Sequence, residues 1–340
     1  MLNCNKKGAL WGNGVWGLRW QFRPGEMVEL RVMAFFLGID GGGTRTSCLI
    51  GDEKSVLGSG TAGASNVLRV GEAVARRALV DGIHQTCEAA KINPAEIGRA
   101  CIGVAGAARQ EVVEAVRRIV ADVVSGEIEI VGDMVITLHA AFGSRPGIIV
   151  IAGTGSIAYG RNLKGKTARA GGWGFAVSDE GSGHWIGRAA VSEALRAGDQ
   201  SEDLSPLLQA IMKVWNIENH DALVLAASAS PAPDFAALFP AVLAAANSGN
   251  VLAEGLLRRA GAELATLAKI VLGRLSFDAD TVPVAMSGGV FANSELVREV
   301  FYNELRVQYP QVVVSKTIAE PVIGALDLAR SRALPVTFHE

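Results

Sequence analysis

Apolar and polar residues follow a pattern along this chain that predicts strands and helices from residue 35 onward. Short apolar runs that end at glycines or charged residues indicate buried strands, whereas apolar residues that recur every three or four positions indicate helices with one buried face. Three consecutive strands are expected first, followed by alternating helices and strands. The expected strands of this first part lie at 35–40, 45–52, 54–63, 99–107 and 127–133, and its expected helices lie at 70–91, 109–124 and 134–143.

The same order of elements starts again at residue 147, which predicts two related α/β halves. Each half opens with an apolar strand that runs into a turn of glycine and threonine, so two such turns at one cleft could hold the two ends of a polyphosphate. The second part is expected to contain a strand, a turn and a strand at 147–162, a third strand at 166–172, an interrupted helical region at 181–275, strands at 281–289 and 311–316, and helices at 291–305 and 320–333.

The first 32 residues do not fit this pattern. They are rich in tryptophan and show no period, and they contain neither the clean apolar centre of a signal peptide nor an obvious strand. We expect biological translation to begin at Met27 or Met33, and we treat residues 1–32 as an extension outside the fold.

Length and charge narrow the class of protein. A chain of 340 residues with 49% hydrophobic residues can form a sizeable core, and its length suggests two domains. The formal net charge of −2 gives no basic surplus for nucleic acid or for an anionic membrane. The longest apolar runs are too short to span a bilayer. We therefore expect neither a nucleic-acid nor a membrane partner.

Cysteine usage indicates a reducing compartment. The four cysteines, Cys4, Cys48, Cys87 and Cys101, form no CxxC pair and have no histidine at metal-ligand spacing. A disulfide framework, a zinc site or an iron–sulfur site is thus not expected. Together with the lack of a convincing signal peptide, this pattern predicts a cytoplasmic protein.

The first glycine turn places a carboxylate beside three glycines. Asp40 ends an apolar run and is followed by Gly41, Gly42, Gly43 and Thr44. Glycine-rich turns let backbone N–H groups surround an anion, and a carboxylate tolerates a nearby anion when a metal ion lies between them. The combination suggests a phosphate bound with Mg²⁺, while a tight hairpin with an incidental aspartate remains the alternative.

Two matches to nucleotide-binding motifs lack the context that their mechanisms need. The segment GRNLKGKT at 160–167 fits the P-loop pattern, but the glycine-rich residues after it cannot begin a stable phosphate-binding helix. A hairpin turn is the better prediction. The segment GTGSIA at 153–158 fits a loose dinucleotide pattern, but a strand rather than a helix is expected after it.

Six segments together resemble the BadF/BadG/BcrA/BcrD-type ATPases of the sugar kinase/Hsp70/actin superfamily, and within them the N-acetylglucosamine kinases. They occur in the family's order over about residues 34–333. The segment at 171–187 is the most specific of them. The segments are GIDGGGTRT (38–46), GVAGA (103–107), IVGD (130–133), IAGTGSIAYG (151–160), GGWGFAVSDEGSGHWIG (171–187) and MSGGVFAN (286–293).

This resemblance implies an α/β fold of two duplicated ribonuclease-H-like domains, the actin-like ATPase fold, with a nucleotide cleft between them. The implied parts are the extension at 1–32, a first domain at 33–142 plus 320–335, and a larger second domain with a helical insert at 143–319. ATP and Mg²⁺ are implied, with Asp40 holding the metal ion through water. The implied nucleotide-binding residues are Asp40, Gly41, Gly42, Gly43, Thr44, Gly153, Thr154, Gly155, Ser156, Ser287, Gly288, Gly289 and Asn293.

The resemblance also implies that Asp133 is the catalytic residue. The family places a general base at this position, where it accepts the proton of the sugar's 6-hydroxyl as that oxygen attacks the γ-phosphorus. Asp133 closes an expected strand and precedes an expected helix, so that a helix-capping role is the structural alternative.

Sugar contacts are implied for five residues: Asn66, Gly106, Gly172, Trp173 and Asp179. Their structural alternatives are a turn conformation for Asn66, packing for Trp173, and capping of the next helix by Asp179 and Glu180. The segment GVAGAAR at 103–109 carries no hydroxyl or carboxylate, unlike the more polar turn of the animal enzymes. How the protein would recognise the sugar's 2-substituent is therefore left open.

The resulting function is an ATP-dependent amino-sugar kinase that acts on the 6-hydroxyl of N-acetylglucosamine, with glucosamine as the alternative substrate. Two further alternatives are an ATPase that activates a CoA-thioester dehydratase or reductase and an ATPase of the chaperone or filament type. The first of these needs cysteines that hold a cluster at a dimer interface, and no second cysteine is close in sequence to Cys48 or Cys101. The second is disfavoured because no appended peptide-binding domain is expected in this sequence. A small amino sugar is the expected partner, and a homodimer is left open.

Overall fold

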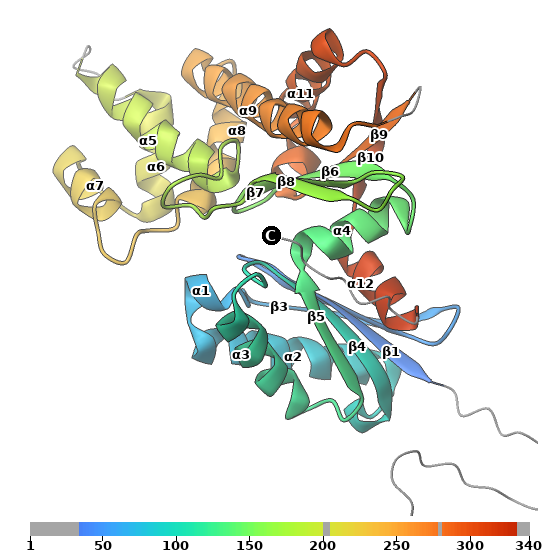
Figure 1. Ribbon diagram of the computed structural model, residues 1–340. Coiled ribbons are helices and arrows are strands. Elements are labelled where there is room, and N and C mark those ends of the chain that lie inside the picture. The colour runs from blue at the N-terminus through green and yellow to red at the C-terminus, as the bar shows by residue number, and fades with distance from the viewer. Residues whose placement is uncertain (1–33, 200–204, 278–280, 332–340) are drawn as a thin grey trace, which may run out of the picture.

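The computed structural model describes residues 34–199, 205–277 and 281–331, and two five-stranded sheets form its centre (Figure 1). The expectation for residues 1–32 lies outside the described residues. The first sheet has the order β3-β2-β1-β4-β5, and the second has the order β10-β9-β6-β7-β8. The strands of the first sheet are β1 (Phe35–Gly41), β2 (Thr46–Gly51), β3 (Val56–Ala62), β4 (Ile97–Val104) and β5 (Glu127–Gly132). Those of the second are β6 (Gly147–Ala152), β7 (Ser156–Arg161), β8 (Thr167–Gly171), β9 (Val282–Ser287) and β10 (Val312–Ala319).

The two sheets repeat one topology. In the first, β1 pairs antiparallel with β2 and parallel with β4, and in the second, β6 pairs antiparallel with β7 and parallel with β9. The two edge strands of each sheet also correspond: β5 lies parallel to β4 as β10 lies parallel to β9, and β3 pairs antiparallel with β2 as β8 does with β7. The duplication expected from the chain order is therefore present in the strand pairing.

Helices cover both faces of the first sheet. The helices α2 (Glu72–Ala90) and α3 (Gln110–Ala121) pack on one face, and α4 (Asp133–Phe142) and α12 (Pro321–Arg330) pack on the other. The last helix lies so close to β1 that a Cβ atom at Gly38 would collide with the backbone of Leu326. The last described helix thus packs on the first sheet.

Helix α4 lies between the two sheets (Figure 1). Ile136 is buried with Cys101 against the first sheet, whereas Leu138 is buried with Ile149 and Tyr159 against the second. Since this helix packs on both halves, its first residue, Asp133, lies where the halves meet.

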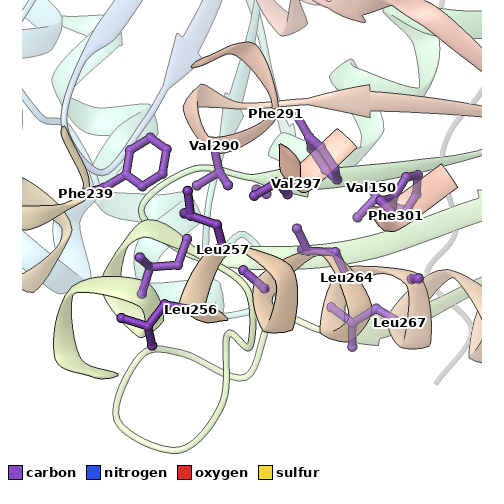
Figure 2. Close-up of a cluster of buried hydrophobic side chains, with 14 of the residues drawn as sticks. Val150, Phe239, Leu256, Leu257, Leu264, Leu267, Val290, Phe291, Val297 and Phe301 are labelled. Carbon is purple, nitrogen blue, oxygen red and sulfur yellow. The ribbon is translucent and has the colours of Figure 1, made fainter. Parts of the chain in front are cut away.

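The largest core lies on the opposite face of the second sheet. Figure 2 shows Leu257 and Leu264 of the long helix α9 gathered with Val150, Phe291 and other side chains of this cluster. In the segment at 233–246, this core buries Phe235, Leu238, Phe239, Val242 and Ala246. The helices of the helical region are α5 (Gly183–Gly198), α6 (Pro206–Trp215), α7 (His220–Ala227), η2 (Phe235–Leu238), α8 (Phe239–Asn247) and α9 (Val251–Leu275).

Three local features refine the sequence prediction. A short helix α1 (Val67–Val70) and a 3-10 helix η1 (Pro94–Glu96) were not expected. The helix expected at 291–305 is divided into α10 (Gly289–Asn293) and α11 (Glu295–Gln308) because the Ser294 side chain caps α11. The P-loop-like segment is a hairpin, in which the Asn162 side chain accepts hydrogen bonds from two backbone N–H groups of the turn between β7 and β8.

No single helix in the described parts of the chain is long and apolar enough to cross a bilayer. One pair of segments, Phe235–Asn247 with Val251–Leu275, passes that test together by length and composition only, and it is bent by 118°.

Candidate active site

The first glycine turn lies at the end of β1. Its backbone closes through a hydrogen bond of 3.0 Å from the Gly42 N–H to the Arg45 carbonyl. The following loop is fastened to this turn, because the Ser65 N–H donates to the Gly42 carbonyl and the Thr46 hydroxyl donates to the buried Ser65 hydroxyl. The first turn (residues 42–45) is thus a fixed backbone surface at the edge of the first sheet.

The second turn (residues 153–155) has the corresponding place at the end of β6. The Gly153 N–H donates to the Gly155 carbonyl at 2.9 Å. The first N–H groups of α5 then donate to this turn, from Gly183 to the Gly153 carbonyl and from His184 to the Thr154 carbonyl. Both carbonyl groups are therefore directed toward α5 and away from any anion at the turn.

The two turns meet although 110 residues separate them. The Thr44 and Thr154 hydroxyl oxygens are 2.8 Å apart, within hydrogen-bond distance. A Cβ atom at Gly43 would lie 3.2 Å from the Thr154 hydroxyl oxygen, a tight contact that glycine avoids. The structure therefore brings together the two turns that the sequence singled out.

The third segment (residues 287–293) adjoins the second turn. Gly288 has a φ of 95° and lies against the backbone of Ala152 and Gly153, so a side chain there would be both strained and obstructed. The buried Ser287 hydroxyl donates to the Ala319 carbonyl, and the exposed Asn293 amide donates to the Gly289 carbonyl. In this conformation Asn293 holds the segment itself, whereas Ser287 joins it to the end of β10.

Three carboxyl groups lie beside the turns, and we call Asp40, Asp133 and Asp179 the carboxylate cluster. Burial and the charge of Asp133 raise the pKa of Asp40 to about 7, although the positive charge of Arg45 opposes this shift. Burial, followed by the charges of Glu180 and Asp133, raises the pKa of Asp179 to about 6. Burial also raises the pKa of Asp133, although the Met134 N–H opposes this shift. Asp133 thus acts electrostatically on both neighbours, and the group carries more negative charge than its surroundings neutralise.

The carboxylate cluster suits a hard cation that uses few protein ligands. Among the described residues no set of three or more His, Cys, Asp or Glu side chains is arranged to hold a metal ion. Mg²⁺ commonly takes one or two carboxylates and completes its octahedron with water and phosphate oxygens. Asp40, whose ionised form is destabilised by burial beside a second acid, fits that role.

Asp133 occupies the first position of α4 and is held by its own helix. Gly132 is the N-cap residue, so Asp133 lies one position beyond the capping position that the alternative assigned to it. Its carboxylate accepts a hydrogen bond of 2.9 Å from the Met134 N–H. Because α4 packs on both sheets, this contact fixes the carboxylate at the boundary between the halves.

Two of the expected sugar contacts lie side by side in the first half. Asn66 is the N-cap of α1, and its side-chain oxygen accepts from the Leu68 N–H at 3.1 Å. Gly106 has a φ of 84°, and a Cβ atom there would lie 2.8 Å from Leu68. The backbone of Asn66 is therefore extended, and not in the left-handed turn of the structural alternative. Its side-chain oxygen already accepts a hydrogen bond, which leaves the side-chain NH₂ group for a ligand.

The other three expected sugar contacts lie in the loop after β8. Asp179 is 6% exposed with a φ of 70°, and its carboxylate accepts from the Gly174 N–H. The alternative role for Asp179 and Glu180 as helix caps is wrong, because the Ser182 side chain caps α5. Gly172 and Trp173 are exposed, and the Trp173 ring stacks on Arg169 with 4.1 Å between the guanidinium carbon and the ring centroid.

Sequence reasoning missed a charged contact across the site. The guanidinium group of Arg69 donates to the Gly43 carbonyl in the first turn and pairs with Asp234 from the second half. The aromatic ring of the buried His184 lies nearby, between Phe175 and Phe235. Arg69 and Asp234 lie outside the six motif segments, so no local signal marked them, whereas Phe175 and His184 belong to the segment at 171–187.

Comparison with known proteins agrees with this arrangement. The model of the BadF/BadG/BcrA/BcrD ATPase family matches residues 37–329. The N-acetylmuramic acid/N-acetylglucosamine kinase of Clostridium acetobutylicum is 33% identical over 307 residues, which cover 88% of this chain and 99% of that protein. The glucosamine kinase GspK of Vibrio cholerae is 30% identical over 236 residues, which cover 68% of this chain and 78% of that protein.

A solved structure shows the same fold. A protein from Chromobacterium violaceum, provisionally assigned as an N-acetylglucosamine kinase, superposes with a TM-score of 0.71 at 27% identity, covering 88% of this chain and 99% of that one. The expected actin-like ATPase fold of two duplicated halves is confirmed by this likeness and by the two equivalent sheets. The chain belongs to the BadF/BadG/BcrA/BcrD ATPase family.

Proposed function

We propose that this protein is an ATP-dependent kinase that transfers the γ-phosphoryl group to the 6-hydroxyl of N-acetylglucosamine. One observation carries the proposal: two glycine turns from opposite halves meet through Thr44 and Thr154 beside the carboxylate cluster. Backbone N–H groups at such turns suit phosphate oxygens, and the carboxylates suit a metal ion and a hydroxyl donor. The names of relatives that act on amino sugars support the choice of acceptor.

Asp133 acts as the general base in this reaction. Its carboxylate takes the proton of the 6-hydroxyl while that oxygen forms a bond to the γ-phosphorus, and the bond from the γ-phosphorus to the bridging oxygen breaks to release ADP. A raised pKa makes a carboxylate a stronger base, provided that it is ionised at the working pH. The charge of Mg²⁺, when bound near Asp40, would supply neutralisation of the phosphate oxygens.

The sugar is held between the loop of Asn66 and the loop of Asp179. The free amide function of Asn66 and the buried carboxylate of Asp179 offer a donor and an acceptor to neighbouring hydroxyls. A buried acceptor that loses its partner is costly, so these groups reject acceptors that lack the matching hydroxyl. Closing the halves around both substrates would exclude water, which otherwise competes for the phosphoryl group.

Glucosamine is the alternative acceptor, and the 2-substituent distinguishes the two. The turn after β4 presents Ala105 and Ala107, whose methyl groups can pack against an acetyl group but cannot pair with a charged amine. This supports the acetylated sugar.

The activator of a CoA-thioester dehydratase or reductase is disfavoured by the cysteines. Cys48, Cys87 and Cys101 are free and at most 2% exposed, whereas a cluster shared by two subunits needs ligands at a surface. Burial raises the pKa of Cys48 and of Cys101 to about 12, so both remain thiols rather than metal-binding thiolates. Cys4 lies outside the described residues.

ADP release with Mg-ATP and a panel of acceptors tests the proposal. The panel contains N-acetylglucosamine, glucosamine, N-acetylmuramate, glucose and no sugar. We expect N-acetylglucosamine to give the largest kcat/KM and the reaction without sugar to be slower by about 10²-fold or more, since bound acceptor positions the attacking oxygen. ADP that appears at the same rate in all five reactions would show a sugar-independent ATPase instead.

A further inference from the structure

Arg69 makes a charged contact between the two halves at the edge of the site. Its Nη1 donates to the Gly43 carbonyl in the first turn at 2.7 Å, and its Nη2 lies 2.6 Å from an Asp234 carboxylate oxygen in the second half. The side chain of Arg69 is 20% exposed and extends from α1, three residues after Asn66. One guanidinium group thus holds the first turn and the opposite half together.

Asp234 is in turn connected to the second turn. Its carboxylate caps η2 by accepting from the Ala237 N–H. Helix η2 packs so closely on α5 that a Cβ atom at Gly187 would collide with the Phe235 carbonyl. Helix α5 then donates its Gly183 N–H to the second turn. A continuous path of contacts therefore runs from the first turn through Arg69 and α5 to the second turn.

We propose that Arg69 is a positioning residue that couples closure of the two halves to the shape of the first turn. When the halves separate, the ion pair between Arg69 and Asp234 breaks. The guanidinium group that donates to the Gly43 carbonyl is then no longer held in place from the second half. When they close, Arg69 pulls that carbonyl outward, so the N–H groups of the first turn face the phosphate. The inference rests on the proposed kinase function for its kinetic consequence, but its structural part does not.

A guanidinium group suits this task better than an amine. Its N–H groups project in a fixed planar fork, so that one group can meet a carbonyl and another a carboxylate at the same time. A lysine at position 69 has one compact charged end and is expected to keep one contact at a time.

Amide hydrogen exchange of the protein without ligands tests the structural part. In Asp234→Asn, we expect exchange in the first turn to be about 10-fold faster, although the substitution lies in the other half. Asp122→Asn is the matched control: Asp122 pairs with Arg76 at the same distance of 2.6 Å, but within the first half. Unchanged exchange in the first turn of Asp234→Asn would overturn the coupling.

Steady-state kinetics test the positioning part. We expect Arg69→Gln and Asp234→Asn each to lower kcat by about 10-fold with a smaller change in the KM for the sugar, and the double variant to be no slower than Arg69→Gln, because coupled residues are not additive. Arg69→Lys should be intermediate. Additive effects, or a wild-type kcat for Asp234→Asn, would overturn the proposal. A wild-type protein that phosphorylates no sugar would refute the proposed function alone, since the exchange experiment still reports on the coupling.

Discussion

Asp133→Asn is expected to lower kcat for N-acetylglucosamine by about 10²–10⁴-fold, the usual contribution of a general base. The amide cannot accept the proton of the 6-hydroxyl, but its oxygen can still accept the hydrogen bond that the Met134 N–H donates to Asp133. The KM values for ATP and sugar should therefore change little. Steady-state kinetics over both substrates measure the effect.

The stability of the same variant separates catalysis from a role in starting the helix. Because burial raises the pKa of Asp133, its ionised form destabilises the folded state. Asp133→Asn should therefore melt at the same temperature as the wild type or higher. Asp122→Asn, on the surface of the same half, should leave both kcat and melting temperature unchanged. If Asp133→Asn retains full activity, the carboxylate of Asp133 has only a structural role at the start of α4, and another residue is the general base.

Asp40→Asn is expected to remove activity and to stabilise the protein without metal at alkaline pH. The pKa of Asp40 rises from 3.8 to about 7 on folding. The unfolded chain releases this proton near pH 4, whereas the folded protein retains it to about pH 7, so stability falls as the pH rises through this interval. At pH 8 the ionised group costs about 2–4 kcal/mol, which Asp40→Asn recovers, and at pH 4 the variant and the wild type should be equally stable.

Mg²⁺ should offset the same cost of ionised Asp40 in the wild type. Its charge offsets the repulsion between Asp40 and Asp133, so Mg²⁺ with an ATP analogue is expected to raise the melting temperature more at pH 8 than at pH 5, where Asp40 is protonated. This pH-dependent difference should vanish in Asp40→Asn. Melting curves at both pH values, with the analogue present and Mg²⁺ added or withheld, measure it. A metal effect of equal size at both pH values would place the ion away from Asp40.

Much of the fold follows from local pattern, because each half repeats strands of clear hydrophobic period between glycine turns. Boundaries were less predictable where one side chain decides them. Ser294 divides one expected helix into α10 and α11, and Ser182 rather than Asp179 caps α5. The sequence also gave no local indication that α4 packs on both sheets, since its apolar residues on opposite faces predict burial but not the partners.

The site could be predicted only where its parts lie in short motifs. The turns at Asp40 and Gly153 are recognisable by glycine, and their meeting was inferred from the duplication. Arg69 and Asp234 are 165 residues apart and lie in segments of ordinary composition, so that their contact depends on how the two halves pack. Such long-range pairs arise from the tertiary structure, and a single sequence carries no local mark of them.

The most direct test of the central claim is the identity of the product. ³¹P NMR of a reaction with Mg-ATP and N-acetylglucosamine, with correlation to the sugar protons, locates the transferred phosphorus. The account predicts a phosphomonoester on the oxygen of carbon 6, formed in equal amount with ADP. Inorganic phosphate in place of a sugar ester, or an ester at another carbon, would contradict it.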